Sequence, residues 1–538
     1  MTTSKAEQAQ YRATLFKHLD GIVTAPSAYE LHAKGVTNYL LEKGDCTLSE
    51  LTTKFNANEG YLNVALRILC SQGWLVQNVD NEKDEIRFTL SRNSAMAFSH
   101  FYLYEDVVKL MRFSANFHFR NFEKEPFQKL EGIFHKIKRN YDLPDTTDSE
   151  SLAIRDHIFK HIEGIILGPT FVRLAMNGMF HKYFMQASFK PEEFHKDAAS
   201  FEQLLDILTH FELFTKNAGT YQFTDKGLFF AKRASAYGVT VSYIPTLRKL
   251  DELIFGNPLA AKAAGDGNQE GHVDRAMNVW GSGGAHSSYF KIVDQIIIDL
   301  FNRPIEEQPK GILDMGCGNG AFLIHLFDVI EKQTLRGTML DEHPLILVGA
   351  DYNEAALGIT KANLIQADIW AKVVWGDIGD PDLLAKDLNE NYNVALGDLL
   401  NVRSFLDHNR IWKAPAGQHN LSQSTSTGAY TFEGKRLNNN DVEASLLEHF
   451  QNWAPYVKRF GLLLIELHTV KPELVAEHLG QTAATAYDAT HGYSDQFILE
   501  VDVFHKVLAG AGLHPHASLF RKFPDSDLAS VTVNLFSM

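Results

Sequence analysis

Residues 310–327 read KGILDMGCGNGAFLIHLF, and this stretch decides the fold of the chain around it. A short apolar run ends in an acidic residue, three glycines follow at alternate positions, and the pattern of an amphipathic helix begins. Glycine lets the backbone turn tightly and approach a ligand without a Cβ, while the start of a helix offers unpaired N–H groups. The stretch therefore predicts a strand, a cofactor-binding loop and a helix, in that order.

The spacing of the glycines indicates which cofactor binds. Gly316, Gly318 and Gly320 form G-x-G-x-G with Asp314 two residues ahead, whereas a dinucleotide fingerprint requires G-x-G-x-x-G. This arrangement resembles motif I of the class I methyltransferases that use S-adenosylmethionine (SAM). The resemblance implies that these four residues bind SAM.

Acidic residues near three later strand patterns extend the resemblance. Asp351 ends the pattern LILVGAD, where that family binds both ribose hydroxyls, although an N-cap of the following helix is the alternative. Asp377 and Ile378 follow a third strand, where the adenine contacts of the family fall. We expect Asp398 at the carboxyl end of a fourth strand, beside the methyl group, because ligands of open α/β sheets gather there.

The predicted fold class is α/β, and the sheet belongs to the last of several predicted domains. The C-terminal half alternates strand-like runs with amphipathic helices, as in a Rossmann-like class I methyltransferase sheet. Before it the chain is mainly helical, and residues 27–91 and 162–235 each follow the order of a winged helix. We predict an N-terminal helical and winged-helix-like domain over 1–160, a second winged-helix-like domain over 161–256, a linker over 257–275 and the methyltransferase domain over 276–538.

Charge and composition exclude several classes of function. The formal net charge of −15 argues against binding of nucleic acid, so we expect the winged helices to form a homodimer or a wall of the substrate site. The three cysteines are too far apart for a disulfide framework or a CxxC metal site. No apolar run is long enough to span a bilayer and no secretory signal is visible, so we expect a cytoplasmic protein without a membrane partner.

Two histidines and a glutamine are candidates for the acceptor side of the site. His468 ends the fifth strand pattern, FGLLLIELH, and is therefore expected at the same rim as Asp398. His491 and Gln496, in the stretch THGYSDQ, lie in the connection to the next helix, which returns over that rim. Such a set suits a divalent metal with open positions, but among 23 histidines a surface or hydrogen-bonded role is the alternative.

Four stretches together carry a closer resemblance: NVWGSGGAHSSYF, LDMGCGNG, NVRSFLDHNR and THGYSDQ. They look like the methyltransferase domain of apratoxin-type polyketide synthase loading modules. The resemblance implies one iron or manganese ion, bound by His468, His491 and Gln496. It also implies methylation of the α-carbon of a malonyl group on an acyl carrier protein. Because the chain ends without a carrier domain, we expect either a small-molecule acceptor or an acyl group on a separate carrier.

Three more side chains are candidates for removing a proton from the methyl acceptor or for binding it. Tyr493 or His408 could take the proton that the acceptor loses. Arg403 could hold a carboxylate in a bidentate grip, and the alternative is a structural ion pair with Asp407.

Two further segments are expected to cover the cofactor. We predict that Gly283 belongs to a loop ahead of a helix that closes over SAM, with Tyr289 facing the pocket, and a plain glycine-rich helix start is the alternative. The polar segment 416–440 is predicted to be a mobile lid or a carrier-docking surface.

Three functions compete on these observations. The leading one is metal-assisted C-methylation of a malonyl-like or β-dicarbonyl acceptor in polyketide or other natural-product biosynthesis. The second is a metal-free small-molecule O-methyltransferase with His468 or His491 as general base. The third is a SAM-binding regulatory protein, which the complete glycine motif and Asp351 disfavour.

Overall fold

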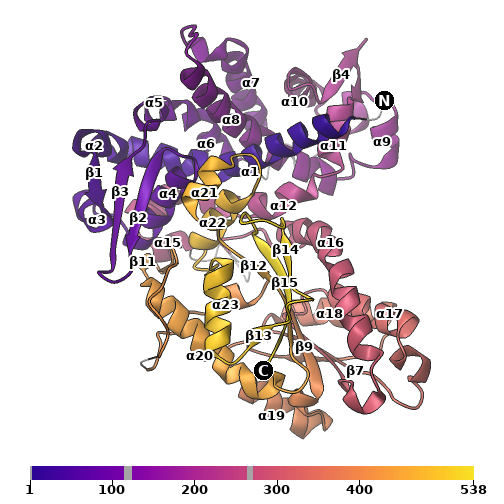
Figure 1. The fold of residues 1–538 in the computed structure, drawn as a ribbon. Coiled ribbons are helices and arrows are strands. Elements are labelled where there is room, and N and C mark those ends of the chain that lie inside the picture. The colour runs from indigo at the N-terminus through magenta and orange to yellow at the C-terminus, as the bar shows by residue number, and fades with distance from the viewer. Residues whose placement is uncertain (1–2, 114–123, 263–270, 418) are drawn as a thin grey trace.

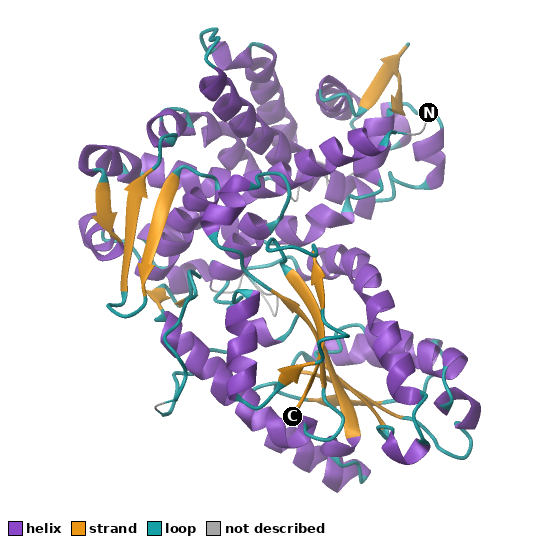
Figure 2. Cartoon of the chain, viewed as in Figure 1, coloured by secondary structure: helices purple, strands orange, loops and turns teal. Residues whose placement is uncertain are grey.

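The computed structural model describes residues 3–113, 124–262, 271–417 and 419–538. Its C-terminal half is built on an eight-stranded mixed sheet in the order β13-β15-β12-β9-β6-β7-β8, with β14 paired to β15 (Figure 2). The five strands from β12 to β8 are parallel, and β15 is antiparallel to β12. The strands are β6 (Gly311–Met315), β7 (Ile346–Asp351), β8 (Lys372–Trp375), β9 (Leu399–Ser404), β12 (Leu462–Leu467), β13 (His514–Pro515), β14 (Arg521–Phe523) and β15 (Val531–Ser537).

Helices cover both faces of this sheet. Because successive strand residues point to opposite faces, Ile312 and Leu347 pack in one core and Leu313 and Val348 in another. One face is covered by α16 (Arg275–Phe301), α17 (Ala321–Gln333) and α18 (Glu354–Gln366), and the other by α19 (Pro381–Tyr392), α20 (Asn439–Val457) and α23 (Val501–Gly510). The predicted α/β sheet is confirmed, and its last two strands, β14 and β15, are antiparallel.

Two long helices, α1 (Lys5–Ala33) and α8 (Ser149–Met176), form the centre of the N-terminal region. Each helix has a glycine at the close approach: a Cβ on Gly21 of α1 would lie 2.3 Å from the His161 Cα, and a Cβ on Gly164 of α8 would lie 2.5 Å from the His18 Cα. The predicted boundary at residue 160 falls inside α8, so the two N-terminal parts share one continuous helix. Of the predicted linker 257–275, residues 263–270 lie outside the described part of the chain.

Two winged-helix units flank these helices, as the sequence predicts. The first contains α2 (Val36–Lys43), β1 (Asp45–Thr47), α3 (Leu48–Phe55), α4 (Glu59–Ser71), β2 (Leu75–Asp80) and β3 (Glu85–Leu90), and the second contains α10 (Ala198–His210), β4 (Phe214–Asn217) and β5 (Thr220–Phe223). The remaining elements are α5 (Ser94–Phe98), α6 (Glu105–Met111), α7 (Lys124–Lys138), α9 (Lys182–Gln186), α11 (Asp225–Ala231), α12 (Ser235–Ser242), α13 (Ile244–Leu247), α14 (Leu250–Phe255), α15 (Pro258–Lys262), β10 (Thr431–Phe432), β11 (Lys435–Arg436), α21 (Pro472–Glu477) and α22 (Ala484–Gly492).

The N-terminal region lies against the end of the sheet that carries α21 and α22 (Figure 1). The segment 416–440, predicted to be a mobile lid, is held between the two halves. The Asn81 side chain donates to the carbonyls of Ser424 and Ser426 at 2.9 and 3.0 Å, and the Thr427 amide donates to Glu500 at 2.8 Å. The described part of 416–440, called the clamp segment, therefore connects the two halves through hydrogen bonds. Within the described ranges, every helix is too short or too polar to cross a bilayer.

Candidate functional site

The glycine loop between β6 and α17 has the backbone that the sequence predicts. Gly316, Gly318 and Gly320 have φ angles of 78°, 56° and 78°, in the left-handed region that favours glycine. A Cβ on Gly316 would lie 2.9 Å from the Leu406 side chain, whereas a Cβ on Gly318 would meet nothing within 4 Å. The loop therefore turns tightly and leaves an open cradle at its middle glycine.

Two carboxylates flank this cradle. Asp351 accepts hydrogen bonds from the amides of Gly318 at 3.0 Å and Asn353 at 2.9 Å. The N-cap of α18 is Asn353, so the alternative role of Asp351 as that N-cap is wrong. Asp314 is buried, its Oδ2 has no hydrogen-bond partner among the described residues, and burial together with Asp351 raises its pKa to about 7. A polar ligand in the cradle would meet one oriented carboxylate and lie near a second.

Asp377 and Ile378, the predicted adenine contacts, lie after β8. Asp377 accepts from the Gly379 amide at 2.8 Å, and the carbonyl of Ile378 accepts from the Trp453 indole at 2.7 Å. The sequence did not indicate Tyr352, which is 59% exposed beside Asp351 with its ring 5.5 Å from that of Trp375. Exposed aromatic residues in loops follow no spacing, so no sequence pattern could have found it.

Three predicted cofactor residues have other roles. Asp398 precedes β9 and lies at its amino end, where it pairs with Lys310 at 2.6 Å and Arg459 at 2.8 Å. It is therefore remote from the carboxyl edge, and its prediction is wrong because the strand begins later than the pattern suggested. Gly283 lies exposed inside α16 rather than in a loop, and Tyr289 of the same helix contacts the rings of Phe405 and Phe523.

A buried polar cluster lies at the carboxyl ends of β9 and β12. Arg403 pairs with Asp407 at 2.5 Å and stacks on the Trp453 ring, so the structural ion pair is its observed role. His449 contacts the same Asp407 oxygen at 2.8 Å. Although burial alone would raise the pKa of Asp407, Arg403 and His449 hold it below its ordinary value.

A histidine–carboxylate pair completes this cluster. His408 Nδ1 donates to Glu466 Oε1 at 2.6 Å, and the Asp407 amide donates to Glu466 Oε2 at 3.0 Å. Glu466 was not among the predicted residues. It interrupts the otherwise apolar strand LLLIEL, and a lone acid in a buried strand was the signal that could have found it.

The stretch THGYSDQ brings His491 and Gln496 to the same place. The His491 ring lies 5.0 Å from that of His408, and its Nδ1 donates to the Tyr487 carbonyl at 2.8 Å. Gln496 Nε2 donates to Asn409 at 2.8 Å, while its buried Oε1 has no partner among the described residues. Burial, with His408 nearby, lowers the pKa of His491 to about 3, so its imidazole is neutral.

His468 and Tyr493 do not belong to this group. His468 Nδ1 donates to the Leu499 carbonyl at 3.1 Å, and its Nε2 accepts from Thr532 Oγ1 at 2.8 Å. Both ring nitrogens are used, so the prediction of His468 as a metal ligand or base is wrong. Tyr493 is fully buried and shares a 2.9 Å hydrogen bond with Ser27 of α1, so it faces the N-terminal region and not the acceptor.

In the part of the chain that the structure describes, no three His, Cys, Asp or Glu side chains are arranged to hold a metal ion. The predicted set differs from such a group because it contains a glutamine. Coordinating atoms without a protein partner at this edge include the Nε2 atoms of His408 and His491, the Oε1 of Gln496 and the Oδ2 of Asp407, as far as the described residues extend.

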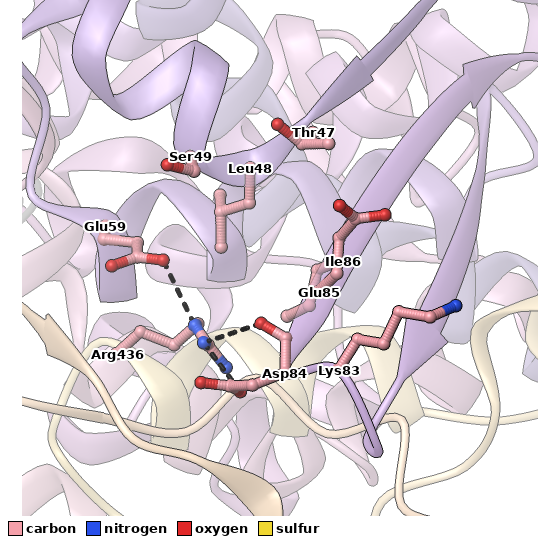
Figure 3. A pocket seen from close by; sticks show the side chains of 9 residues that line it. All are labelled: Thr47, Leu48, Ser49, Glu59, Lys83, Asp84, Glu85, Ile86 and Arg436. Carbon is pink, nitrogen blue, oxygen red and sulfur yellow. Dashed lines mark hydrogen bonds and ion pairs between the residues drawn. The ribbon is translucent and has the colours of Figure 1, made fainter.

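A separate pocket lies at the first winged-helix unit (Figure 3). Arg436 of β11 reaches into it and pairs with Glu59 at 3.1 Å and Asp84 at 2.8 Å. None of the predicted cofactor or acceptor residues lines this pocket. Its ion pairs join the two halves of the chain.

Comparisons with known proteins agree with this organisation. Protein-family models match residues 270–534 as an AprA MT2-like domain, residues 11–77 as an AprA N-terminal domain and residues 163–257 as an AprA winged helix domain. No curated protein sequence matches the chain.

Among solved structures, similar folds include an O-methyltransferase family protein from Burkholderia thailandensis, with 12% identity, a TM-score of 0.41, and coverage of 73% of this chain and 98% of that one. The CurJ carbon methyltransferase shows 14% identity, a TM-score of 0.32, and coverage of 75% and 97%. The SAH-bound methyltransferase CalO1 of calicheamicin biosynthesis shows 15% identity, a TM-score of 0.33, and coverage of 73% and 99%. These TM-scores lie below 0.5, so the assignment rests on the family models.

The three family models match successive parts of one architecture and together span most of the chain. The left-handed glycine loop, with Asp351 bonded to its middle glycine, lies between β6 and α17 of the matched methyltransferase domain. The protein therefore belongs to the AprA-type class I methyltransferases and is a SAM-dependent enzyme.

Proposed function

We propose that the enzyme methylates the α-carbon of a malonyl-like or β-dicarbonyl acceptor with the help of a divalent iron or manganese ion. The observation that carries the proposal is the convergence of His408, His491 and Gln496 at the carboxyl edge of the sheet. Each offers a coordinating atom that no described residue uses. His408 thus takes the place that sequence reasoning gave to His468.

The surroundings of the two histidines support this role. Because Glu466 accepts the Nδ1 proton of His408, the lone pair of that ring is on Nε2, and a carboxylate partner of this kind raises the basicity of a metal ligand. The Tyr487 carbonyl fixes the same tautomer in His491. Burial keeps His491 neutral, and only a neutral imidazole can coordinate a metal.

A bound divalent ion would supply a Lewis acid that neutralises enolate charge on a chelated 1,3-dicarbonyl. The chain itself positions the reactants. Leu406 packs against Gly316 of the cofactor loop, and Asp407 and His408 follow directly, so the donor loop and the proposed ligands are joined by one short segment. Methyl transfer needs such placement, since in-line geometry at near-attack distance contributes much of the rate.

A metal-free O-methyltransferase is the second candidate, and the same histidine favours it. His408, held by the buried Glu466 at 2.6 Å, has the arrangement of a general base whose partner stabilises the protonated ring. In this alternative the base is His408 rather than His468 or His491.

The proposal also covers the setting of the reaction. The acceptor is a free small molecule or an acyl group on a carrier protein, in polyketide or other natural-product biosynthesis in the cytoplasm. The match to an AprA MT2-like domain supports this choice. A homodimer through the winged-helix units remains part of the proposal.

Elemental analysis of the protein, purified without chelators, tests the metal. We expect one iron or manganese ion per chain, retained in His468→Gln and lost in His408→Ala and His491→Ala. A protein that is free of metal and still transfers methyl groups would contradict the proposal and favour the metal-free O-methyltransferase with His408 as general base. Retention of metal in His408→Ala would show that the ligand set is wrong.

A further inference from the structure

One face of helix α4 lies along the segment that carries His491 and Gln496. Tyr61, Val64 and Arg67 are spaced three residues apart, so they share one side of the helix. They meet Asp495, Gly492 and Asp488 in that order, which means that helix and segment run antiparallel. All three α4 side chains are buried, with Tyr61 0% and Arg67 1% exposed.

Each of the three contacts is specific. Tyr61 Oη donates to Asp495 Oδ1 at 2.8 Å, and Arg67 Nε donates to Asp488 Oδ2 at 2.9 Å. Between them, a Cβ on Gly492 would lie 2.7 Å from the Val64 side chain, so the two backbones approach as closely as glycine allows. The contacts at Asp488 and Gly492 lie on either side of His491 in the sequence. The contact at Asp495 involves the residue directly before Gln496.

Arg67 also joins this segment to two other parts of the methyltransferase half. Its guanidinium donates to Thr469 Oγ1 at 3.0 Å and to the Val470 carbonyl at 2.9 Å, directly after β12, and to Thr427 in the clamp segment. Thr469 Oγ1 in turn donates to Asp488 Oδ1 at 2.6 Å. Arg67, Thr469, Asp488 and Gln496 line one narrow pocket, so the Arg67 network and Gln496 face the same space.

We infer that α4 is a positioning element of the acceptor site, whose Tyr61, Val64 and Arg67 hold His491 and Gln496 in register with His408. This inference rests on the proposed function for the identity of that site. In a winged helix the third helix is the one that reads DNA, but here its face is buried against the methyltransferase half. The N-terminal region therefore contributes directly to the geometry of the acceptor side.

A purely adhesive role for α4 is the competing explanation, and the chain provides matched controls for it. Arg436 is another arginine that joins the two halves through ion pairs, with Glu59 and Asp84, and it lies at the separate pocket of Figure 3. Tyr104 is another buried N-terminal tyrosine, whose hydroxyl is 2.8 Å from His161 Nδ1 and makes no contact with the segment.

The experiment compares Tyr61→Phe and Arg67→Lys with the controls Tyr104→Phe and Arg436→Lys, in the full chain. Three quantities are measured: affinity for Co²⁺ alone by its visible absorption, affinity for SAM by calorimetry, and the unfolding temperature. We expect Tyr61→Phe and Arg67→Lys to weaken Co²⁺ binding by about 10- to 100-fold, as for outer-sphere changes, with SAM affinity changed by less than about twofold. Both controls keep the wild-type affinity for Co²⁺.

Two results would overturn the inference. One is wild-type Co²⁺ affinity in both α4 variants. The other is a parallel loss of Co²⁺ binding, SAM binding and unfolding temperature in α4 variants and controls, which would mean adhesion only. Tyr61→Phe removes a single hydroxyl and keeps the test informative if Arg67→Lys does not fold.

A wild-type protein that binds no Co²⁺ would count against the metal in the proposed function and not against α4. The same variants are then compared by methyl transfer to malonyl-pantetheine. Loss of kcat at unchanged SAM affinity supports the positioning role. An unchanged kcat contradicts it.

Discussion

His408 and His468 follow neighbouring strands of one sheet edge, yet their hydrogen bonds give them opposite roles. His408 Nδ1 donates a hydrogen bond to Glu466, and its Nε2 has no partner among the described residues. Both ring nitrogens of His468 are hydrogen-bonded, one to Leu499 and the other to Thr532. The difference lies in the partners that the surrounding fold supplies: His468 directly follows β12, whereas His408 lies in a turn four residues beyond the end of β9. A buried histidine can therefore bind a metal only if one of its ring nitrogens is left without a hydrogen-bond partner in the protein.

The buried His468 gives a prediction for stability against pH. Burial lowers its pKa from 6.5 to about 3, so between these values the unfolded chain binds a proton that the folded chain does not. The contribution to the free energy of unfolding is complete above about pH 6.5 and falls as the pH drops toward 3. Denaturant titrations should show that His468→Gln destabilises the protein at pH 7 and that its difference from wild type shrinks toward pH 4. A difference that grows on acidification would contradict this assignment.

Asp351 gives a prediction for the cofactor. A carboxylate that accepts charge-assisted hydrogen bonds from ribose hydroxyls contributes enough for Asp351→Ala to weaken SAM binding by about 10- to 100-fold. Calorimetric titration of SAM measures this loss. Asp398→Ala is the matched control, since Asp398 pairs with Lys310 and Arg459 at the opposite end of its strand. Equal losses in the two variants would mean that the cradle has been misplaced.

At the scale of elements, two glycine-rich stretches with similar composition form different structures. The loop 316–320 takes left-handed backbone at every second residue, while Gly283 lies in the regular helix α16. In α16, glycine serves packing, because a Cβ on Gly281 would lie 2.7 Å from the Gly238 Cα of α12. Composition alone does not separate a ligand loop from a close helix crossing.

Matched alanine substitutions test this difference. Gly316→Ala places a Cβ 2.9 Å from Leu406 at a φ of 78°, and we expect SAM binding to fall beyond detection. Gly283→Ala adds a methyl group in open space on a helix, and should raise stability by about 0.5–1 kcal/mol with SAM affinity unchanged. Calorimetry measures the SAM affinity of both variants and thermal unfolding measures their stability. A loss of SAM affinity in Gly283→Ala would support the prediction that Gly283 belongs to a loop covering SAM.

The sequence was sufficient for the elements whose signal is local. The glycine loop, the acid that ends β7 and the order of elements in each winged unit follow from spacing within a few residues. The acceptor side is different, because His408, Glu466 and His491 come from three separate segments and meet only through the sheet order β12-β9-β6. Asp398 was misplaced because a start of β9 only a few residues later than expected moves a side chain to the other end of the sheet.

At the scale of the whole molecule, the two halves are joined by several buried polar contacts. Arg67, Tyr61 and Ser27 of the N-terminal region bond to Asp488, Asp495 and Tyr493 of the other half. Breaking such buried pairs leaves charges without partners, which costs more than ordinary surface contacts between domains. The chain should therefore behave as one cooperative unit.

Calorimetric unfolding tests this cooperativity. We expect a single transition for wild type, moved as a whole to higher temperature by SAM, with about 2.7 kcal/mol of added stability at 100 times the dissociation constant. Arg67→Met should separate the transition into two, of which SAM moves only one. Two transitions in wild type would contradict this cooperativity.

An isotope-labelling experiment decides whether the enzyme transfers the methyl group to carbon with the help of a metal ion. The enzyme is incubated with malonyl-pantetheine and SAM carrying a ¹³C-labelled methyl group, with Mn²⁺ and with chelator, and the products are followed by ¹³C NMR. We expect a label bound to carbon, formed with Mn²⁺, lost with chelator and lost in His408→Ala and His491→Ala. A label bound to oxygen, or transfer to carbon that continues in chelator, would contradict it.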